Sequence, residues 1–288
     1  RVIEQRTRQP CKRGHIFTQV VDRDAIIFSY TERETSDAVK ALFKGFKDYV
    51  QADAKSVYDA FFRPPDDASA EADTPTEVGC WSHGRRKFWE ATVTKDAVAR
   101  EGLMRIGRMF ELEKTWRDKP PAERLRLREK HMTVNLAEFF ACADGEHQAG
   151  PRPRGLLATA LGYVVRQKSA LEIFVRDERL VMDNNRSERV LRAVAVGRKA
   201  WLFCGSDDHA SAAANLMTLI ASAKLHGLDP ELYLCELTRV LPHWPRERFI
   251  ELAPKNWART WSRLNAKQVD ADFGWITVPP PEEQPDAG

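Results

Sequence analysis

The stretch HIFTQVVDRDAIIFSYTERETSDAVKALFKGFKDYVQADA, residues 15–54, decides the fold class. Its first part holds two short runs of β-branched and aromatic residues, HIFTQVV and AIIFSY, joined by VDRD, which predict an antiparallel hairpin. SDAVKALFKGFKDYV follows with apolar residues at helical spacing and predicts an amphipathic helix. YVQADA then predicts a short strand that ends at Asp53. Strands and a helix in this order indicate an α/β fold.

The remainder of the chain is predicted to be mostly helical. EVGCW is a further expected strand and runs into a basic helix, SHGRRKFWEA. In residues 97–174 apolar side chains recur at the helical period, which predicts an all-helical insert. A helix is expected to start in the cluster Asp183 to Asn185 and to stop at Gly197, with WLFCGS as a short buried strand or an extended segment after it. A last long helix is expected to end at Gly227, and Asp229 is expected to cap the next one.

The composition is that of a folded globular protein. The chain has 288 residues, of which 43% are apolar and 30% are charged, so it is long enough to bury a core. No uncharged apolar run of about 18 residues occurs, and the start RVIEQRTRQPCKRGH has no apolar segment, so neither a membrane span nor a secretory signal is expected. Five scattered cysteines indicate reduced thiols in a cytoplasmic protein. Because the first residue is Arg, we expect the chain to be part of a longer reading frame.

Two carboxylates are candidates for metal binding. Asp53 ends an expected strand, where the carboxyl end of a sheet presents side chains to ligands, although a turn aspartate that caps the next segment has the same position. Glu188 lies in the first turn of an expected helix, and its spacing from Asn185 also fits a local capping box. Arginines flank Glu188, and mixed acids and bases suit a site where the acids hold Mg²⁺ and the bases hold phosphate.

Basic residues gather around Glu188. The net charge of the whole chain is only +3, but residues 183–199 carry five basic side chains against two acidic ones. We expect these five to face phosphate, the alternative being a solvated helix face: Arg186, Arg189, Arg192, Arg198 and Lys199. Arg85 and Arg86, in SHGRRKFWEA, are further candidates for holding DNA or a second copy of the chain.

Other kinds of site have little support in the sequence. Cys80 and His83 have the spacing of half a zinc site, but no second pair of ligands at such a spacing is present. We therefore expect Cys80 to be a buried residue rather than a metal ligand. No Walker loop, GxGxxG, GxSxG or HExxH motif occurs, so no nucleotide cofactor and no serine or zinc protease chemistry is expected.

The segment DNNRSERVLRAVAVGRKAWLFCGSDD, residues 183–208, resembles the transposases of the insertion-sequence-66 family. The corresponding stretch of that family has the form DNN-x-x-ER-x-LR-x-x-x-x-GRK-x-W-LF-x-GS. Three further segments, VQADAKSVYDAFF, CWSHGRRKFWEA and LIASAKLHGLDPELYL, are similar to other parts of the family. The resemblance spans Asp53 to about Leu241, which is most of the chain.

The resemblance implies an RNase H-like core of the DDE type, which binds two divalent ions, Mg²⁺ or Mn²⁺, and cuts and joins DNA by phosphodiester transfer. It implies Asp53 as the second catalytic acid and Glu188 as the last, both as metal ligands. The family's first aspartate lies on a strand upstream of HIFTQVV, and no such segment occurs in residues 1–14, so an N-terminal truncation is expected. The implied partners are transposon-end and target DNA and further copies of the chain in a homo-oligomer, with no membrane and no nucleotide cofactor. The implied location is the bacterial cytoplasm, in association with DNA.

Four parts are expected on this basis: a partial RNase H-like core in 1–95, a helical insertion in 96–180, the final core helix with a C-terminal helical block in 181–245, and a tail in 246–288. Without the first aspartate, the chain by itself is expected to bind DNA but not to cut it, because two-metal chemistry needs an acid that bridges both ions. The alternative is therefore a catalytically inactive remnant that binds DNA or dimerises with the intact transposase. A helical scaffold with no DNA role would require the charges of 183–199 to be incidental.

Overall fold

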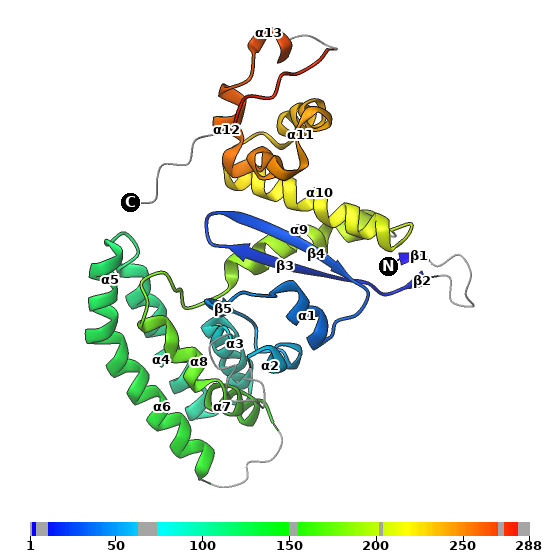
Figure 1. Cartoon of the computed structure of the whole chain (residues 1–288). Coiled ribbons are helices and arrows are strands. Elements are labelled where there is room, and N and C mark those ends of the chain that lie inside the picture. The colour runs from blue at the N-terminus through cyan, green and yellow to red at the C-terminus, as the bar shows by residue number, and fades with distance from the viewer. Residues whose placement is uncertain are drawn as a thin grey trace. The chain divides into compact units, whose positions relative to one another are not determined.

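The computed structural model forms two compact units, one made of Arg1–Arg33 with Arg189–Gly288 and the other of Glu34–Glu188. We refer to them as unit 1 and unit 2. The chain is mostly helical and carries three small two-stranded sheets among the described residues, in keeping with an α/β fold (Figure 1). The structure describes residues 2–3, 11–62, 74–149, 155–201, 204–269 and 274–281.

Unit 1 combines a hairpin with the C-terminal helices and most of helix α9. Its elements are β1 (Val2–Ile3), β2 (Cys11–Lys12), β3 (His15–Val21), β4 (Ala25–Thr31), α9 (Asn185–Trp201), α10 (Asp207–Leu225), α11 (Pro230–Val240), η5 (Leu241–His243), η6 (Arg246–Leu252), α12 (Pro254–Ser262) and α13 (Ala266–Val269). β1 pairs with β2 and β3 with β4, both antiparallel. The predicted hairpin is confirmed, and helices fill much of the range 246–269 that was expected to be a tail.

Helix α10 covers the outer edge of β4. The Ser222 hydroxyl accepts from the backbone N–H of Ile26 at 3.1 Å and donates to the carbonyl of the same residue at 3.0 Å. The Thr218 hydroxyl accepts from the N–H of Phe28 at 2.9 Å. Ile26 and Phe28 are buried with Ala214 of α10. Two helix hydroxyls thus satisfy backbone groups that a further strand would otherwise have to bond.

The predicted end of α10 and the predicted cap of α11 are both confirmed. Gly227 follows α10 with a φ of +71°, a left-handed conformation that glycine adopts without steric cost. The Asp229 carboxylate accepts from the N–H groups of Glu231 and Leu232, both at 2.9 Å. These signals are local, so the sequence was sufficient to place them.

Unit 2 contains a pair of parallel strands and a cluster of helices. Its elements are α1 (Ser36–Leu42), β5 (Tyr49–Gln51), α2 (Ser56–Phe62), β6 (Thr76–Val78), α3 (Trp81–Ala91), η2 (Thr92–Thr94), α4 (Ala97–Thr115), α5 (Pro121–Leu127), the π-helical turn η3 (Arg128–Met132), α6 (Thr133–Gln148), α7 (Leu156–Arg166), α8 (Lys168–Glu172), η4 (Ile173–Val175) and the first turn of α9. The predicted strand at YVQADA is present but ends at Gln51, two residues before Asp53. The helices of 97–175 agree with the predicted helical insert.

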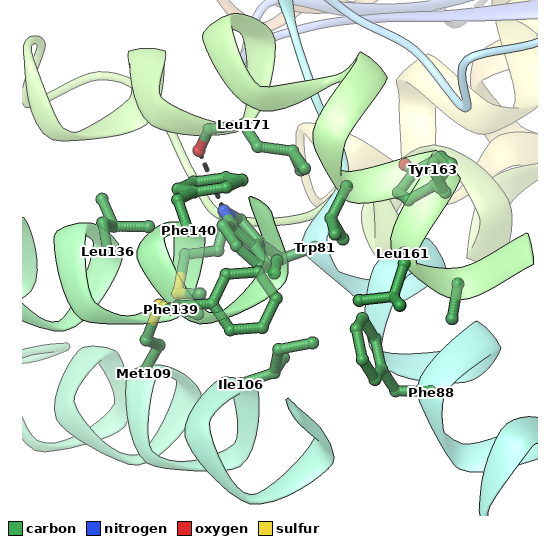
Figure 2. Close-up of a cluster of buried hydrophobic side chains, with 14 of the residues drawn as sticks. Trp81, Phe88, Ile106, Met109, Leu136, Phe139, Phe140, Leu161, Tyr163 and Leu171 are labelled. Atoms are coloured by element: carbon green, nitrogen blue, oxygen red, sulfur yellow. Dashed lines mark hydrogen bonds between the residues drawn. The ribbon is translucent and has the colours of Figure 1, made fainter. Parts of the chain in front are cut away.

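The core of unit 2 is aromatic (Figure 2). Trp81 is fully buried, and its ring meets that of Phe139 edge to face at 5.3 Å. The Trp81 indole N–H donates to the carbonyl of Leu171 at 2.9 Å, which satisfies its one polar group. Phe88, further along α3, packs against Gly102 of α4, where no side chain would fit. The first turns of α3 are therefore held rigidly by the core.

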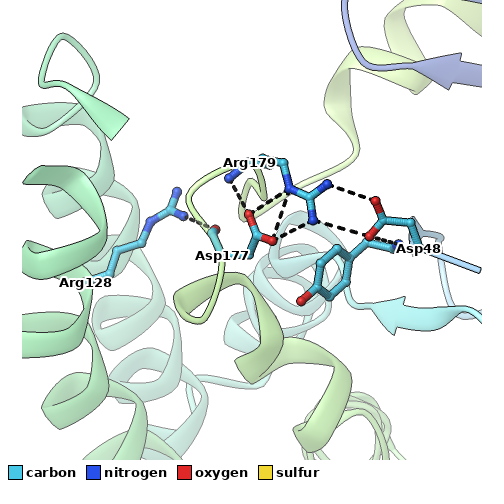
Figure 3. A network of polar contacts seen from close by, with 5 residues as sticks. Asp48, Arg128, Asp177 and Arg179 are labelled. Atoms are coloured by element: carbon cyan, nitrogen blue, oxygen red, sulfur yellow. Dashed lines mark hydrogen bonds and ion pairs between the residues drawn. The ribbon is translucent and has the colours of Figure 1, made fainter. Parts of the chain in front are cut away.

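A buried arginine joins the helical insert to the segment before α9. The π-helical turn η3 places Arg128 inside, with 1% of its side chain exposed, and its Nε donates to Glu113 Oε1 at 2.6 Å. The Arg128 Nη1 donates to the carbonyl of Phe174 at 2.9 Å. It also donates to the carbonyl of Asp177 at 3.2 Å (Figure 3). A buried charge with this many acceptors is satisfied, and it fixes the path of the chain that leads to α9.

The predicted end of the helix at Gly197 is wrong, and the segment WLFCGS differs from its prediction at its first residue. The helix does not stop at Gly197 but continues to Trp201, so WLFCGS is not extended from its first residue. Glycine costs a helix interior only about 1 kcal/mol relative to alanine, and the good helix formers Arg198, Lys199 and Ala200 follow it. Residues 202–203 of that segment lie outside the described residues.

Candidate functional site

Asp53 lies at the carboxyl edge of the parallel pair β5–β6. The strands pair from Tyr49 opposite Thr76 to Gln51 opposite Val78, and the N–H of Ala52 adds a bond to the Val78 carbonyl at 3.3 Å. Asp53 is the residue after Ala52, and its side chain is half-buried. Side chains that follow neighbouring parallel strands meet at one edge of a sheet, which is the edge where α/β proteins bind ligands.

The chain turns sharply after Asp53. Ala54 has a φ of +56°, a left-handed conformation that is uncommon for any residue with a side chain. Ala54 nevertheless packs against the core of unit 2, so tertiary contacts hold it in place. Backbone of this kind collects at functional sites because the surrounding structure must fix it.

Ion pairs and hydrogen bonds connect the segment before α9 to both ends of strand β5. Arg179 forms ion pairs with Asp177 at 2.8 Å and with Asp48, the residue before β5, at 2.9 Å (Figure 3). At the other end of β5, Gln51 Nε2 donates to the carbonyls of Gly79 at 3.1 Å and Val181 at 2.9 Å. The approach to α9 therefore follows the strand pair to its carboxyl edge.

Hydrogen bonds join the start of α9 to the start of α3. The N–H of Trp81 donates to the Met182 carbonyl at 2.9 Å, and the Cys80 thiol donates to Asn184 Oδ1 at 3.0 Å. Asn185 Nδ2 donates to the Ser82 hydroxyl at 3.1 Å. Residues roughly a hundred positions apart in sequence are thus held side by side at the end of β6.

Glu188 lies beside His83 as a result. Its Oε1 is 3.5 Å from His83 Nε2, with half of the Glu188 side chain and 27% of that of His83 exposed. The alternative of a capping box is not what the structure shows, because the N–H of Asn185 donates to Asp183 at 3.1 Å and its side chain bonds Ser82. Glu188 therefore does not serve as a helix cap, and its carboxylate faces the start of α3.

The pKa values of half-buried Tyr58 and buried Tyr163 are both raised. Burial raises the pKa of Tyr58 to about 12, and the Asp53 carboxylate acts on that pKa in the same direction. Burial raises the pKa of Tyr163 as well, with Cys80 and then Asp53 as additional causes. The Tyr163 hydroxyl donates to the Cys80 carbonyl at 3.1 Å. Tyr163 thus contacts Cys80, three residues before His83, which in turn contacts Glu188.

The donor set suits a hard divalent cation that completes its shell with other oxygens. Mg²⁺ is usually held by one or two carboxylates together with water and substrate phosphate. Among the described residues no group of three or more His, Cys, Asp or Glu side chains is arranged to hold a metal ion. Cys80 and His83 face different partners, and burial raises the pKa of the Cys80 thiol, which opposes the thiolate that zinc requires. That Asp53 and Glu188 bind metal stays a prediction.

The predicted DNA-contacting residues lie on the surface. Arg189, Arg192, Arg198 and Lys199 of α9 are exposed and Arg186 is half-buried, and none of the five makes an ion pair with a residue that the structure describes. Arg85 and Arg86 of α3 are exposed as well, but Arg86 pairs with Glu90 at 3.2 Å, and Arg85 lies over the Phe110 ring. Their role toward DNA stays a prediction for both helices.

Three residues of this site were not predicted from the sequence: His83, Tyr163 and Asn184. His83 drew attention only as half of a zinc pair with Cys80, although that spacing did single it out. Tyr163 carries no signal in the sequence, because its place depends on a helix more than eighty residues after Cys80.

The described helices include none that is long and apolar enough to cross a membrane.

Comparison with known families gives two matches along the chain. A family model described as the transposase IS66 family matches residues 1–212, and one described as the IS66 C-terminal element matches residues 218–255. Similar curated proteins come from Sinorhizobium fredii (strain NBRC 101917 / NGR234). The uncharacterized protein y4hP is 30% identical over 281 residues, which cover 88% of this chain and 49% of y4hP. The uncharacterized protein y4qI is 29% identical over 238 residues, which cover 80% of this chain and 43% of y4qI.

The chain thus spans about half the length of the curated relatives it matches. No solved structure matches it significantly.

Proposed function

This chain belongs to the IS66 family of transposases, and from that premise we propose that its residues contribute a divalent-metal site for cutting and joining DNA. Asp53 and Glu188 are the two carboxylates of the proposed site. The observation that supports the proposal is the hydrogen bonding of the segment before α9 and of the α9 start to residues at and after the carboxyl ends of β5 and β6, because Asp53 follows β5 and Glu188 lies in the first turn of α9. The RNase H-like type of the core is part of the same proposal.

The two carboxylates would hold Mg²⁺ or Mn²⁺. Both offer hard oxygen ligands, and both are open enough to solvent for water and phosphate oxygens to complete the shell. When bound, such an ion would activate an attacking oxygen or stabilise a leaving one in phosphodiester transfer. Ala54, the residue after Asp53, packs against the core of unit 2, and a firm backbone beside a metal ligand matters because a displaced ligand loses most of its effect.

The cations of α9 would hold the DNA backbone. An arginine that has no acid beside it keeps its full charge for a phosphate, and its planar head can bond two phosphate oxygens at once. The five α9 cations make no ion pair with a described residue, so their charges are available for phosphate. Contacts of this kind fix the position of DNA and give affinity without reading its sequence.

The test is a strand-transfer assay with DNA that carries the ends of the element flanking the gene. It compares residues 1–288 with a protein extended upstream to the length of the relatives, each with Mg²⁺ and each as wild type, Asp53→Asn and Glu188→Gln. We expect the extended protein to join DNA, and each substitution to lower the rate at least about a hundredfold. Full activity in either variant would overturn the assignment of that carboxylate.

The inactive, DNA-binding alternative makes a different prediction for the same assay. It requires residues 1–288 and the extended protein both to bind DNA and neither to join it. The α9 cations, which have no ion-pair partner among the described residues, support binding under either reading, so binding alone does not separate them. Joining by the extended protein does separate them.

A further inference from the structure

We propose that His83 is a positioning residue for Glu188, which directs that carboxylate toward the edge where Asp53 lies. The proposal rests on the function proposed above and adds a residue to its site. It concerns the first turn of α3, where His83 Nε2 and Glu188 Oε1 are 3.5 Å apart.

The other nitrogen of the ring has no partner among the described residues. His83 Nδ1 is buried and makes no hydrogen bond to any of them. A buried polar atom without a partner is costly, and an apolar side chain would fill the same space at a lower cost. Packing alone therefore does not explain a histidine at this position, whereas the group that faces its Nε2 does.

The contact determines which nitrogen carries the proton in the neutral ring. An ionised carboxylate only accepts hydrogen bonds, so Nε2 must be the donor if it is to approach Glu188. Nδ1 is then an acceptor without a proton. A distance of 3.5 Å is long for a hydrogen bond, but Glu188 is half-exposed and a small rotation of its side chain would close the gap. Such contacts are often long before the ligands bind and shorten afterwards.

The histidine is itself held firmly. α3 begins at Trp81, whose side chain is fully buried and whose N–H is bonded to Met182. The neighbouring Ser82 and Cys80 bond Asn185 and Asn184 of the opposite turn. His83 therefore meets Glu188 from a rigid support, which is what a group needs if it is to orient a flexible ligand.

The first experiment determines the ring tautomer by nitrogen-detected NMR of the histidines in the 288-residue chain. In the neutral ring, at a pH high enough that one nitrogen is unprotonated, we expect the proton on Nε2 of His83 and none on Nδ1. A proton on Nδ1 instead would overturn the proposal, because Nε2 would then repel the carboxylate. This measurement needs no metal and no activity.

The second experiment measures the affinity for Mn²⁺ by titration calorimetry. We expect His83→Ala to weaken binding by about 10- to 100-fold, as is typical when a group that orients a metal ligand is removed. His83→Gln keeps a donor near the position of Nε2 and should stay within about threefold of wild type. His147→Ala, at an exposed histidine of α6, is the matched control and should have no effect.

The variants Asp53→Asn and Glu188→Gln separate failure of this inference from failure of the proposed site. If both abolish Mn²⁺ binding while His83→Ala leaves it unchanged, His83 has no positioning role. If neither changes Mn²⁺ binding, the proposed metal site itself is wrong, and the role of His83 falls with it. Thermal melting of each variant checks that the loss is not one of folding.

Discussion

Helices α3 and α9 are both basic, yet the structure uses their charges differently. α3 buries Trp81 and Phe88, and each of its adjacent cations has a partner within unit 2: Arg85 lies over Phe110, Arg86 pairs with Glu90, and Lys87 lies over Tyr163. α9 has no buried residue, and its five cations make no ion pair with described residues. A run of basic residues therefore does not predict a DNA-binding surface until the partners of each charge are known.

The largest expected difference between the two helices is in stability. Phe88→Ala in α3 should lower the free energy of unfolding by about 3 to 5 kcal/mol, because it opens a cavity in the aromatic core. Leu191→Ala in α9 removes a side chain that is 39% exposed and should cost about 0.5 kcal/mol. Urea denaturation of both variants measures the two values. Similar losses would mean that α9 is packed as firmly as α3.

The second difference is in catalysis by a transposition-competent protein that contains these residues. Glu188→Gln in α9 should raise the barrier for strand transfer by about 2.7 to 4 kcal/mol, since it removes a charged ligand. Glu90→Gln in α3 removes an acid whose partner is Arg86 and should leave the rate within about twofold. Single-turnover rates at saturating Mg²⁺ give both numbers, and an equal loss in Glu90→Gln would contradict the assignment.

The third prediction concerns the packing of α3 against α4. Gly102→Ala places a methyl group against the Phe88 ring and should destabilise the chain by about 1 to 3 kcal/mol. Gly107→Ala, further along the same helix, meets nothing within 4 Å and should stabilise it by about 0.5 to 1 kcal/mol. Thermal melting of the pair is the measurement. Stabilisation by both substitutions would show that α3 does not pack closely on α4.

The smallest expected effect is on DNA affinity. Each of Arg189→Ala, Arg192→Ala and Arg198→Ala should lower the slope of log affinity against log salt by about 0.9, the value for one phosphate contact. Arg86→Ala should change the slope less, because Glu90 already neutralises that charge. Titrations of labelled duplex DNA at several salt concentrations measure the slopes. A larger change in Arg86→Ala than in the α9 variants would reverse the comparison.

Much of the fold was predictable because its signals are local. The β3–β4 hairpin follows from two β-branched runs and a short turn, and α11 begins where Asp229 precedes a proline. Gly227 ends α10 because the left-handed conformation there suits a glycine. Gly197 carries the same residue type but stays inside α9, since the residues that follow favour the helix. A glycine therefore marks a helix end only when its surroundings leave it free to turn.

The candidate site was predictable in part. The residue types could be read from the chain alone: two carboxylates, each at the end or start of an expected element, and a cluster of cations around one of them. The contacts around them depend on the tertiary structure. The bonds from Gln51 to Val181, from Cys80 to Asn184 and from Asn185 to Ser82 join parts of the chain more than a hundred residues apart. No local pattern encodes such contacts, because they depend on how an entire helical insert packs between the two ends that they connect.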